Sequence, residues 1–380
     1  MELLGGFGLW GLGWTGWIIP FLFVLSIVVF FHELGHFLVA RWCGVKVLTF
    51  SVGFGPEIIG FNDRHDTRWK ISAVPLGGYV KFFGDENAAS VPDQAAIAAM
   101  TPAEQQQSFI HKSVLQRVAI VAAGPLANFV LAIVIFAAVF TLFGKQITSA
   151  RVDTVQPESA AAAAGFEPGD LVVAIDGRAI DSFIDMQRIV ASSAGRTLEM
   201  TVDRGGVRVN LKAVPTLREV KDTFGNVQRI GVLGISRSPA PGDVRTERVD
   251  PLTAVKMGME ETWFVIERTM SYLGGVVVGR ESADQLGGPI RIAQVSGQVA
   301  SVGLAALIHL AAVLSVSIGL LNLFPIPLLD GGHLLFYAIE AIRGQPLSER
   351  AQELGFRIGL AIVLMLMTYA TFNDILRLMS

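Results

Sequence analysis

The sequence predicts a polytopic α-helical membrane protein with four transmembrane helices, a membrane-associated β-hairpin region and an inserted α/β domain. Hydrophobic residues make up 52% of the 380 residues and charged residues only 17%, a balance typical of proteins with several membrane spans. No Asp, Glu, Lys or Arg occurs from Leu3 to Phe31. Between the second and third apolar stretches lies a long polar segment, which is where we expect the inserted domain.

Charge and cysteine content narrow the function classes further. The net charge is −3 and no Lys/Arg-rich block occurs, so nucleic acid is not an expected partner. The lone Cys43 cannot form an intrachain disulfide. The first twenty residues contain no Lys or Arg, and the apolar stretch continues beyond them. We therefore expect the first span to be retained rather than cleaved as a signal peptide.

Four apolar stretches are candidates for membrane spans because each is long, hydrophobic and almost free of charge. The first has tryptophans at both ends, which are typical interfacial anchors. The fourth is short, and we expect Arg357 at its start to extend toward the interface. The predicted spans are Trp17 to Trp42, Val118 to Phe143, Leu304 to Phe324 and Ile358 to Phe372.

The Lys and Arg residues of the short loops predict the orientation. Arg41, Lys46, Arg64, Arg68, Lys70, Lys81 and Lys112 lie between or at the ends of spans one and two, and Arg343 and Arg350 lie between spans three and four. By the positive-inside rule these loops are cytoplasmic, and both termini and the segment from about Gly144 to Gly303 lie outside. His32 and His36 then fall in the cytoplasmic half of span one.

The outside segment has the pattern of a compact α/β module. We expect strands at 152–155, 171–175 and 198–204, with a hairpin turn at Gly205-Gly206 leading back into a strand from Val207. Helices are expected at 160–164, closed by Gly165, and at 182–191. This pattern, with the segments from Ala164 to Asp170 and Ile175 to Gly177, resembles a PDZ domain. A mixed sandwich without a ligand would give the same pattern, whereas a PDZ groove would bind an extended peptide by strand addition.

The loop after span one contains two strand-like segments, Val45 to Val52 and Trp69 to Val74. A peptide bond inside a helix is shielded by its own hydrogen bonds, so a protease acting there needs an extended substrate. One interpretation is therefore a hairpin whose edge pairs with an unwound substrate strand. The alternative is a hairpin that simply lies on the cytoplasmic surface.

The segment His32-Glu33-Leu34-Gly35-His36 lies within the first predicted span. Residues four apart share one face of a helix, so the two imidazoles can hold one zinc ion while Glu33 reaches the attacking water as general base. A pattern with three fixed positions also arises by chance. However, an acidic residue at the centre of a membrane helix costs about 2.5 to 3.5 kcal/mol, so Glu33 needs a functional reason and the pattern predicts a hydrolase.

A catalytic zinc site usually has three protein ligands and one open position, so a third ligand is needed. Pro325 and Pro327 must end or break the third span, and Asp330 lies just beyond them. Local sequence equally allows a solvated Asp-Gly-Gly turn at this point. The other candidates are His333, which could instead cap the next helix, His309, a residue of the third span, His65 in a charged loop, and His111 at the interface.

Several segments together resemble the site-2 proteases of the bacterial RseP type. These are His32 to His36, Gly124 to Phe129, the PDZ-like insertion and Asn322 to His333, with Gly287 to Ile290 resembling the segment that precedes span three. The resemblance implies that His32, His36 and Asp330 bind zinc, that Glu33 is the catalytic base, and that Asn322 helps to hold the substrate strand. It also implies a membrane-reentrant hairpin after span one and a helix after the PDZ domain, within Asp250 to Val278, near the substrate entrance.

The predicted function is that of a zinc metalloendopeptidase of the cell inner membrane that cuts single-pass transmembrane proteins. Substrates implied by the resemblance are anti-sigma factors and remnant signal peptides; a substrate tail or another peptide would bind the PDZ domain. The alternatives are a PDZ scaffold that senses peptides, in which Glu33 is dispensable, and a zinc transporter. A transporter needs polar groups along several spans, but span two offers only Asn128 and span four little beyond Thr368.

The predicted domains are a membrane half at 1–143, a periplasmic PDZ domain at 144–240, a linking helix with a membrane-associated segment at 241–303, and a second membrane half at 304–380. Well-known RseP proteins carry two PDZ domains in tandem, whereas this chain has room for one. A single PDZ domain can still exclude bulky outer domains by size. Deletion of Arg151 to Pro215 is then expected to let longer substrates be cut.

Overall fold

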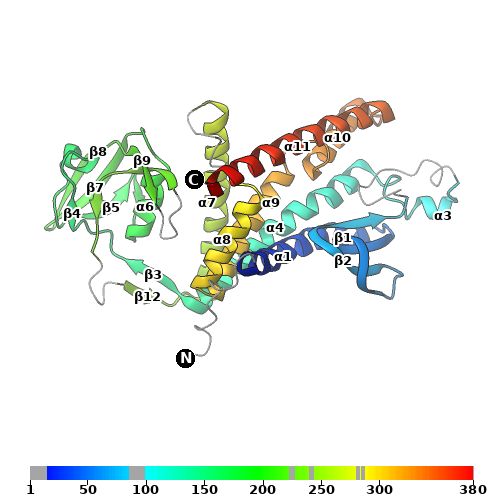
Figure 1. Cartoon of the computed structure of the whole chain (residues 1–380), viewed down its shortest axis with the longest axis horizontal. Helices are drawn as coiled ribbons and strands as arrows, with labels where there is room; N and C mark the ends of the chain where they lie inside the picture. Colours follow the sequence, from blue (N-terminus) through cyan, green and yellow to red (C-terminus); the bar gives the residue numbers. More distant parts are fainter. Residues whose placement is uncertain are drawn as a thin grey trace. The chain divides into compact units, whose positions relative to one another are not determined.

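The computed structural model describes residues 15–84, 99–221, 227–238, 244–279, 283 and 287–379. The chain forms two compact units, each described by itself below (Figure 1). Unit 1 comprises residues 1–138 and 255–380, and unit 2 comprises residues 139–254.

Among the described residues, four helices are long and apolar enough to cross a membrane, as expected, and they lie wholly or mostly in unit 1. They are α1 (Thr15–Trp42), α4 (Val114–Phe143), α9 (Leu304–Asn322) and α11 (Glu349–Met379). Helix α9 ends at Asn322, before Pro325, because a proline cannot donate the next helical hydrogen bond. Helix α11 is 31 residues long, so the expected fourth span at 358–372 was too short at both ends.

Among the described residues, unit 1 also contains α8 (Pro289–Val302), α10 (Asp330–Arg343), the short α3 (Pro102–Gln105) and most of α7 (Pro251–Val277). Glycines permit close approach between these helices. A Cβ at Gly258 of α7 would lie 2.7 Å from the Ile133 carbonyl oxygen of α4, and one at Gly297 of α8 would lie 2.5 Å from Trp17 of α1. Helix α8 therefore packs directly against α1.

The N-terminus of α8 receives its cap from another helix. The Asp374 carboxylate of α11 accepts hydrogen bonds from the Gly288 N–H at 3.0 Å and from the Arg291 N–H at 2.9 Å. Asp374 is buried, so water does not compete strongly for these donors. The first turn of α8 is thereby satisfied and α11 is fixed to it.

The loop after α1 forms an antiparallel hairpin of β1 (Val47–Asn62) and β2 (Arg68–Phe82), longer than the strands expected from sequence. The strands bend so that residues 49–52 pair with 78–81 on one side and with 68–71 on the other, while 59–62 pair with 68–71. The segment order is therefore 78–82, 47–52, 68–71 and 59–62. One end packs on α1 through stacked Phe50 and Trp69, whose ring centroids are 4.3 Å apart.

The hairpin also exposes large apolar side chains. They are Phe54, Ile58, Ile59, Phe61, Ile71, Val74 and Leu76. So many exposed large apolar side chains are unusual on a water-facing hairpin and are typical of contact with lipid or a partner chain.

Unit 2 has the expected α/β elements. Its main sheet has the order β6-β5-β7-β8, with β5 (Leu171–Ile175), β6 (Arg178–Ala179), β7 (Leu198–Arg204) and β8 (Val207–Ala213), all antiparallel. Helices α5 (Ala160–Ala164) and α6 (Phe183–Ala191) begin at Ser159 and Ser182, whose side chains accept the N-cap hydrogen bonds. Gly165 ends α5 in the left-handed region. The core includes Val152, Val172, Met186, Leu198 and Met200.

Two-stranded ladders surround this sheet. They are β4 (Thr154–Val155) with β11 (Ile235–Ser236), β9 (Thr216–Lys221) with β10 (Val227–Val232), and β3 (Lys145–Thr148) with β12 (Val244–Glu247). In the last ladder Lys145 pairs with Glu247 and Thr148 with Val244. The chain therefore enters and leaves unit 2 at the same place.

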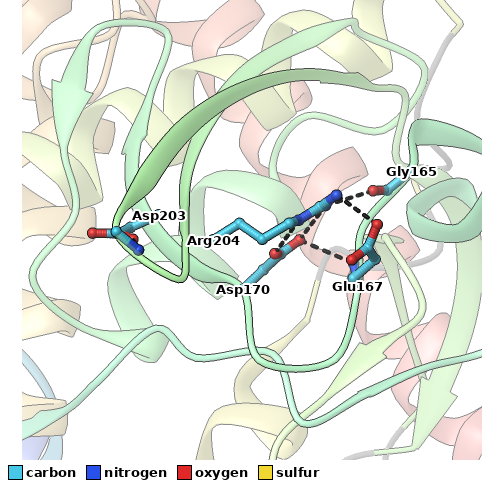
Figure 2. Close-up of polar contacts among 6 residues, drawn as sticks. Gly165, Glu167, Asp170, Asp203 and Arg204 are labelled. Atoms are coloured by element: carbon cyan, nitrogen blue, oxygen red, sulfur yellow. Dashed lines mark hydrogen bonds and ion pairs between the residues drawn. The ribbon is translucent and has the colours of Figure 1, made fainter.

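Arg204, at the end of β7, fixes the loop that precedes β5 (Figure 2). Its guanidinium donates to both carboxylate oxygens of Asp170 at 2.7 and 2.8 Å, to Glu167 at 2.6 Å and to the Gly165 carbonyl at 2.8 Å. Burial alone would raise the pKa of the Asp170 carboxyl, but the hydrogen bonds from Arg204 and the Glu167 N–H outweigh burial and hold that pKa below its usual range.

Candidate metal centre

Helix α1 presents both histidines to α4. His32 and His36 are buried and one turn apart, and glycines bring the two helices together. A Cβ at Gly35 would lie 2.2 Å from the Ala123 carbonyl oxygen, and one at Gly124 would lie 2.2 Å from His36 Nε2. Only residues without a side chain allow this approach, so Gly124 leaves the space in which the imidazoles sit.

The loop before α10 brings Asp330 to the same place. Pro325 and Pro327 prevent a continuous helix, and Leu328 has φ of 104°, a conformation that a bulky residue adopts only when its surroundings impose it. A Cβ at Gly331 would lie 2.2 Å from the Phe324 carbonyl oxygen, and one at Gly332 would lie 2.5 Å from that of Ile326. The Asp-Gly-Gly sequence is thus the tightly packed start of α10, not a solvated turn.

Three donor atoms converge. His32 Nε2 lies 3.2 Å from His36 Nε2 and 3.2 Å from Asp330 Oδ2, and His36 Nε2 lies 3.5 Å from the same oxygen. Ligand atoms at ordinary zinc distances and tetrahedral angles lie about 3.3 Å apart. Among the described residues, Asp330 Oδ2 is buried without a well-aligned hydrogen-bond donor. The donor set and its spacing therefore fit a zinc ion.

Contacts from neighbouring elements hold these groups. His36 Nδ1 lies 2.9 Å from the Ile120 carbonyl oxygen of α4, which can only accept, so the proton is at Nδ1 and the Nε2 lone pair is free. Arg117 of α4 forms a 2.5 Å ion pair with Glu340 of α10 and lies over the Tyr337 ring. This partly buried pair connects α10, which begins at Asp330, to the helix that supports His36.

Glu33 lies between the histidines in sequence and is half-buried. The hairpin passes directly over it, since a Cβ at Gly78 of β2 would lie 2.9 Å from Glu33 Cγ and 2.8 Å from Val29. Residues 78–82 form an edge of the hairpin, and no other described strand pairs with their outer side. An extended strand edge therefore lies beside the carboxylate.

The remaining sequence candidates do not join the three donors among the described residues. His333 packs among Phe336, Tyr337 and Phe356, and His309 lies against Phe136. His65 and His111 are exposed. Asn322 is the last residue of α9 and is half-buried.

Sequence reasoning assigned no role to Gly124, Ile120 or Gly78. The segment Gly124 to Phe129 supported the family resemblance, but the meaning of its glycine depends on the distance to a helix that is far away in sequence. Ile120 acts through its backbone carbonyl, which any residue possesses. Only the Gly77-Gly78 pair carried a local signal, because adjacent glycines in a strand indicate close approach of another segment.

Comparison with known proteins shows which family the chain belongs to. The sequence matches peptidase family M50 over residues 20–366. The chain belongs to this family. A protein of Agrobacterium fabrum named as a zinc metalloprotease is 54% identical over 361 residues, covering 95% of this chain and 96% of the relative. Metalloprotease MmpA of Caulobacter vibrioides is 42% identical over 388 aligned positions, covering 96% of this chain and 97% of the relative.

Among solved structures, the chain is similar to the PDZ domain of the SdrC-like protein of Listeria monocytogenes, with 24% identity and a TM-score of 0.18, covering 23% of this chain and 83% of that one. The family and the relatives confirm the expected resemblance to site-2 proteases. The M50 chain is a zinc metalloendopeptidase of the membrane, with peptides or proteins as its substrates.

Proposed function

We propose that this M50 protease is an intramembrane endopeptidase that cuts single-pass transmembrane segments. The observation that carries the proposal is the convergence of His32, His36 and Asp330, from a spanning helix and a loop at the end of another, within 4.8 Å of one another. Glu33 lies on α1, the same apolar helix that carries the two histidines. A hydrolytic centre built there is suited to a substrate that lies in the membrane.

Each residue has a proposed role. His32 and His36 through Nε2, and Asp330 through a carboxylate oxygen, hold zinc. When bound, zinc supplies Lewis acidity toward the scissile carbonyl and the attacking water. Glu33 takes the proton from that water and returns it to the leaving amine. The apolar helices around the site limit access of bulk water and so strengthen these electrostatic contributions.

The hairpin offers a way to hold an unwound substrate. We propose that a substrate strand pairs with the edge at residues 78–82, because this edge adjoins Glu33 at Gly78. Backbone pairing suits many sequences, since it does not depend on side chains. Asn322 is proposed to hold the other side of this strand. The exposed apolar side chains of the hairpin would then lie in lipid.

Topology and partners complete the proposal. The distribution of Lys and Arg favours periplasmic termini, a periplasmic unit 2 and an active site toward the cytoplasmic side of the bacterial inner membrane. Unit 2, as a PDZ domain, would bind a peptide or substrate tail. Anti-sigma factors and remnant signal peptides are the proposed substrates, after another protease has removed the substrate's outer domain.

The test combines metal analysis with cleavage of a model single-pass substrate in detergent or liposomes. Glu33→Gln keeps the size of the side chain but removes the base, so we expect normal zinc content and at least about a hundredfold slower cleavage. His32→Ala and Asp330→Ala should lose zinc as well. Glu353→Gln, at an exposed site of α11, is the matched control and should cleave normally. Full activity of the Glu33 variant would refute the mechanism and favour a scaffold or transporter.

A further inference from the structure

Asn128 of α4 lies beside the metal centre with one half of its amide unsatisfied. The side chain is fully buried, and its Nδ2 is 3.2 Å from His32 Nδ1. The amide oxygen is also buried, and among the described residues no donor reaches it. A buried acceptor without a donor is destabilising, so this arrangement needs an explanation.

The explanation lies in the proton of His32. A neutral imidazole carries one N–H, and a ring nitrogen can bind a metal only through a free lone pair. His32 faces His36 and Asp330 through Nε2, so the metal-binding form carries its proton on Nδ1. That N–H then requires an acceptor, but the amide nitrogen that lies opposite can only donate.

Rotation of the amide by half a turn resolves the conflict. The oxygen and nitrogen of an Asn side chain have nearly the same size, and either can occupy a given position. After the rotation, Oδ1 accepts from His32 Nδ1–H and is no longer unsatisfied. His36 needs no such choice, because its Nδ1 meets the Ile120 carbonyl, which accepts in any state.

The position of Asn128 is fixed by its neighbours on α9. Ser315 donates a hydrogen bond from its hydroxyl to the Asn128 carbonyl at 2.9 Å, and both residues are fully buried. A Cβ at Gly319 would lie 3.1 Å from Asn128 Cβ. The amide can therefore rotate about its own axis, but the residue cannot move away from His32.

We infer that Asn128 is a positioning residue which, through Oδ1, fixes the metal-binding tautomer of His32. The inference rests on the proposed metal site and deepens it. Groups that orient a metal-binding histidine typically contribute about 10- to 100-fold to metal affinity. Asn128 touches neither the metal nor the substrate in this role.

The test measures zinc affinity of the purified full chain by competition with a chelator, independently of cleavage. Asn128→Leu removes the acceptor at similar volume and should weaken zinc binding tenfold or more. Asn128→Asp keeps an acceptor but has no donor, so it should stay within tenfold of wild type. Asn373→Leu, a buried amide of α11, is the matched control and should bind zinc normally.

Two outcomes overturn the inference: a folded Leu variant with zinc affinity within tenfold of wild type, or an Asp variant that is weaker by tenfold or more. If the Leu variant does not fold, as judged by thermal melting, the Asp variant decides by the same limit. A wild-type chain that binds no zinc would instead refute the proposed metal site itself. The two failures are thus distinguishable.

Discussion

Gly124 is the residue that lets α4 lie against both imidazoles. A Cβ here would overlap His36 Nε2 at 2.2 Å and approach His32 Cε1 at 2.9 Å. These atoms belong to packed, buried rings, which cannot move aside without leaving the position that Asp330 completes. Gly124 therefore favours metal binding because it has no side chain, and not because it contributes a ligand or a charge.

We predict that Gly124→Ala weakens zinc binding by at least about tenfold and slows cleavage accordingly, with about 1 to 3 kcal/mol lost in stability from overpacking. Chelator competition and a melting curve measure both effects. Gly274→Ala is the matched control, because a Cβ there meets nothing within 4 Å. Equal zinc affinity in the two variants would contradict this prediction, because α1 and α4 could then accommodate the extra methyl group without disturbing the site.

At the scale of residues, the sequence predicts a site only where the residues that form it are close together in the chain. His32, Glu33 and His36 fall within one turn of one helix, so their spacing alone indicates a shared face. Asp330 meets them only because Pro325, Pro327 and two glycines fold a loop back against α1. No local pattern distinguishes that loop from a solvated turn, and only the family resemblance favoured Asp330. The part played by Asn128 depends on the orientation of an amide, which sequence does not encode.

Among the elements, α8 depends most on a distant partner. Its N-cap position is Gly288, which has no side chain, and Asp374 of α11 supplies the missing acceptor. From the sequence we expected only a membrane-associated segment where α8 lies, and nothing in the sequence shows that helix α11 caps the N-terminus of another helix. Hydropathy likewise locates the apolar centre of α11 and misses its polar ends, because helical hydrogen bonding continues beyond the apolar stretch.

We predict that Asp374→Ala destabilises the chain by about 0.5 to 2 kcal/mol, the usual cost of a lost N-cap. The backbone amides of Gly288 and Arg291 should exchange with solvent faster, as measured by hydrogen exchange. Asp374→Asn retains one acceptor oxygen and should lose less. Unchanged exchange at both amides in the Ala variant would contradict this role.

The Arg204 cluster of unit 2 predicts a dependence on pH. The pKa of Asp170 is lower in the folded state than the unfolded value of about 3.9, so its stabilisation is complete above that value and is lost as pH falls through the folded pKa. Resistance of unit 2 to pepsin in urea should therefore decline below about pH 4. Arg204→Met should lower this resistance at pH 5 and flatten the decline.

A matched control for that experiment is Arg229→Met, which removes an exposed pair with Glu219. Exposed pairs contribute little, so this variant should follow the wild-type curve. A wild-type curve that is flat between pH 5 and 2.5 would contradict a stabilising role for Asp170.

For the whole molecule, the β3–β12 ladder determines how unit 2 can be removed. Deletion of Arg151 to Pro215 would remove β4, which pairs with β11, and the main sheet with α6, but would leave β9 and β10 of the same unit, which extends over residues 139–254. Joining Thr148 to Val244 by an Asn-Gly turn preserves the ladder instead, because these residues are its last pair.

We predict that this variant keeps zinc and cuts single-pass substrates with large outer domains that the intact chain leaves uncut. The reason is steric, since the proposed PDZ domain would no longer exclude such substrates. Cleavage of one transmembrane segment carrying outer domains of increasing size measures the effect, and a substrate with no outer domain is the control. The same size limit in both chains would contradict a filter.

The distribution of the site along the chain has a consequence for biosynthesis. Residues 32 and 36 emerge from the ribosome early, whereas Asp330 follows unit 2 and three further helices. Under the proposed mechanism the ligand set is complete only after the C-terminal half has been made and inserted. A nascent or truncated chain that ends before Asp330 would carry both histidines and Glu33 without being able to degrade the membrane segments around it.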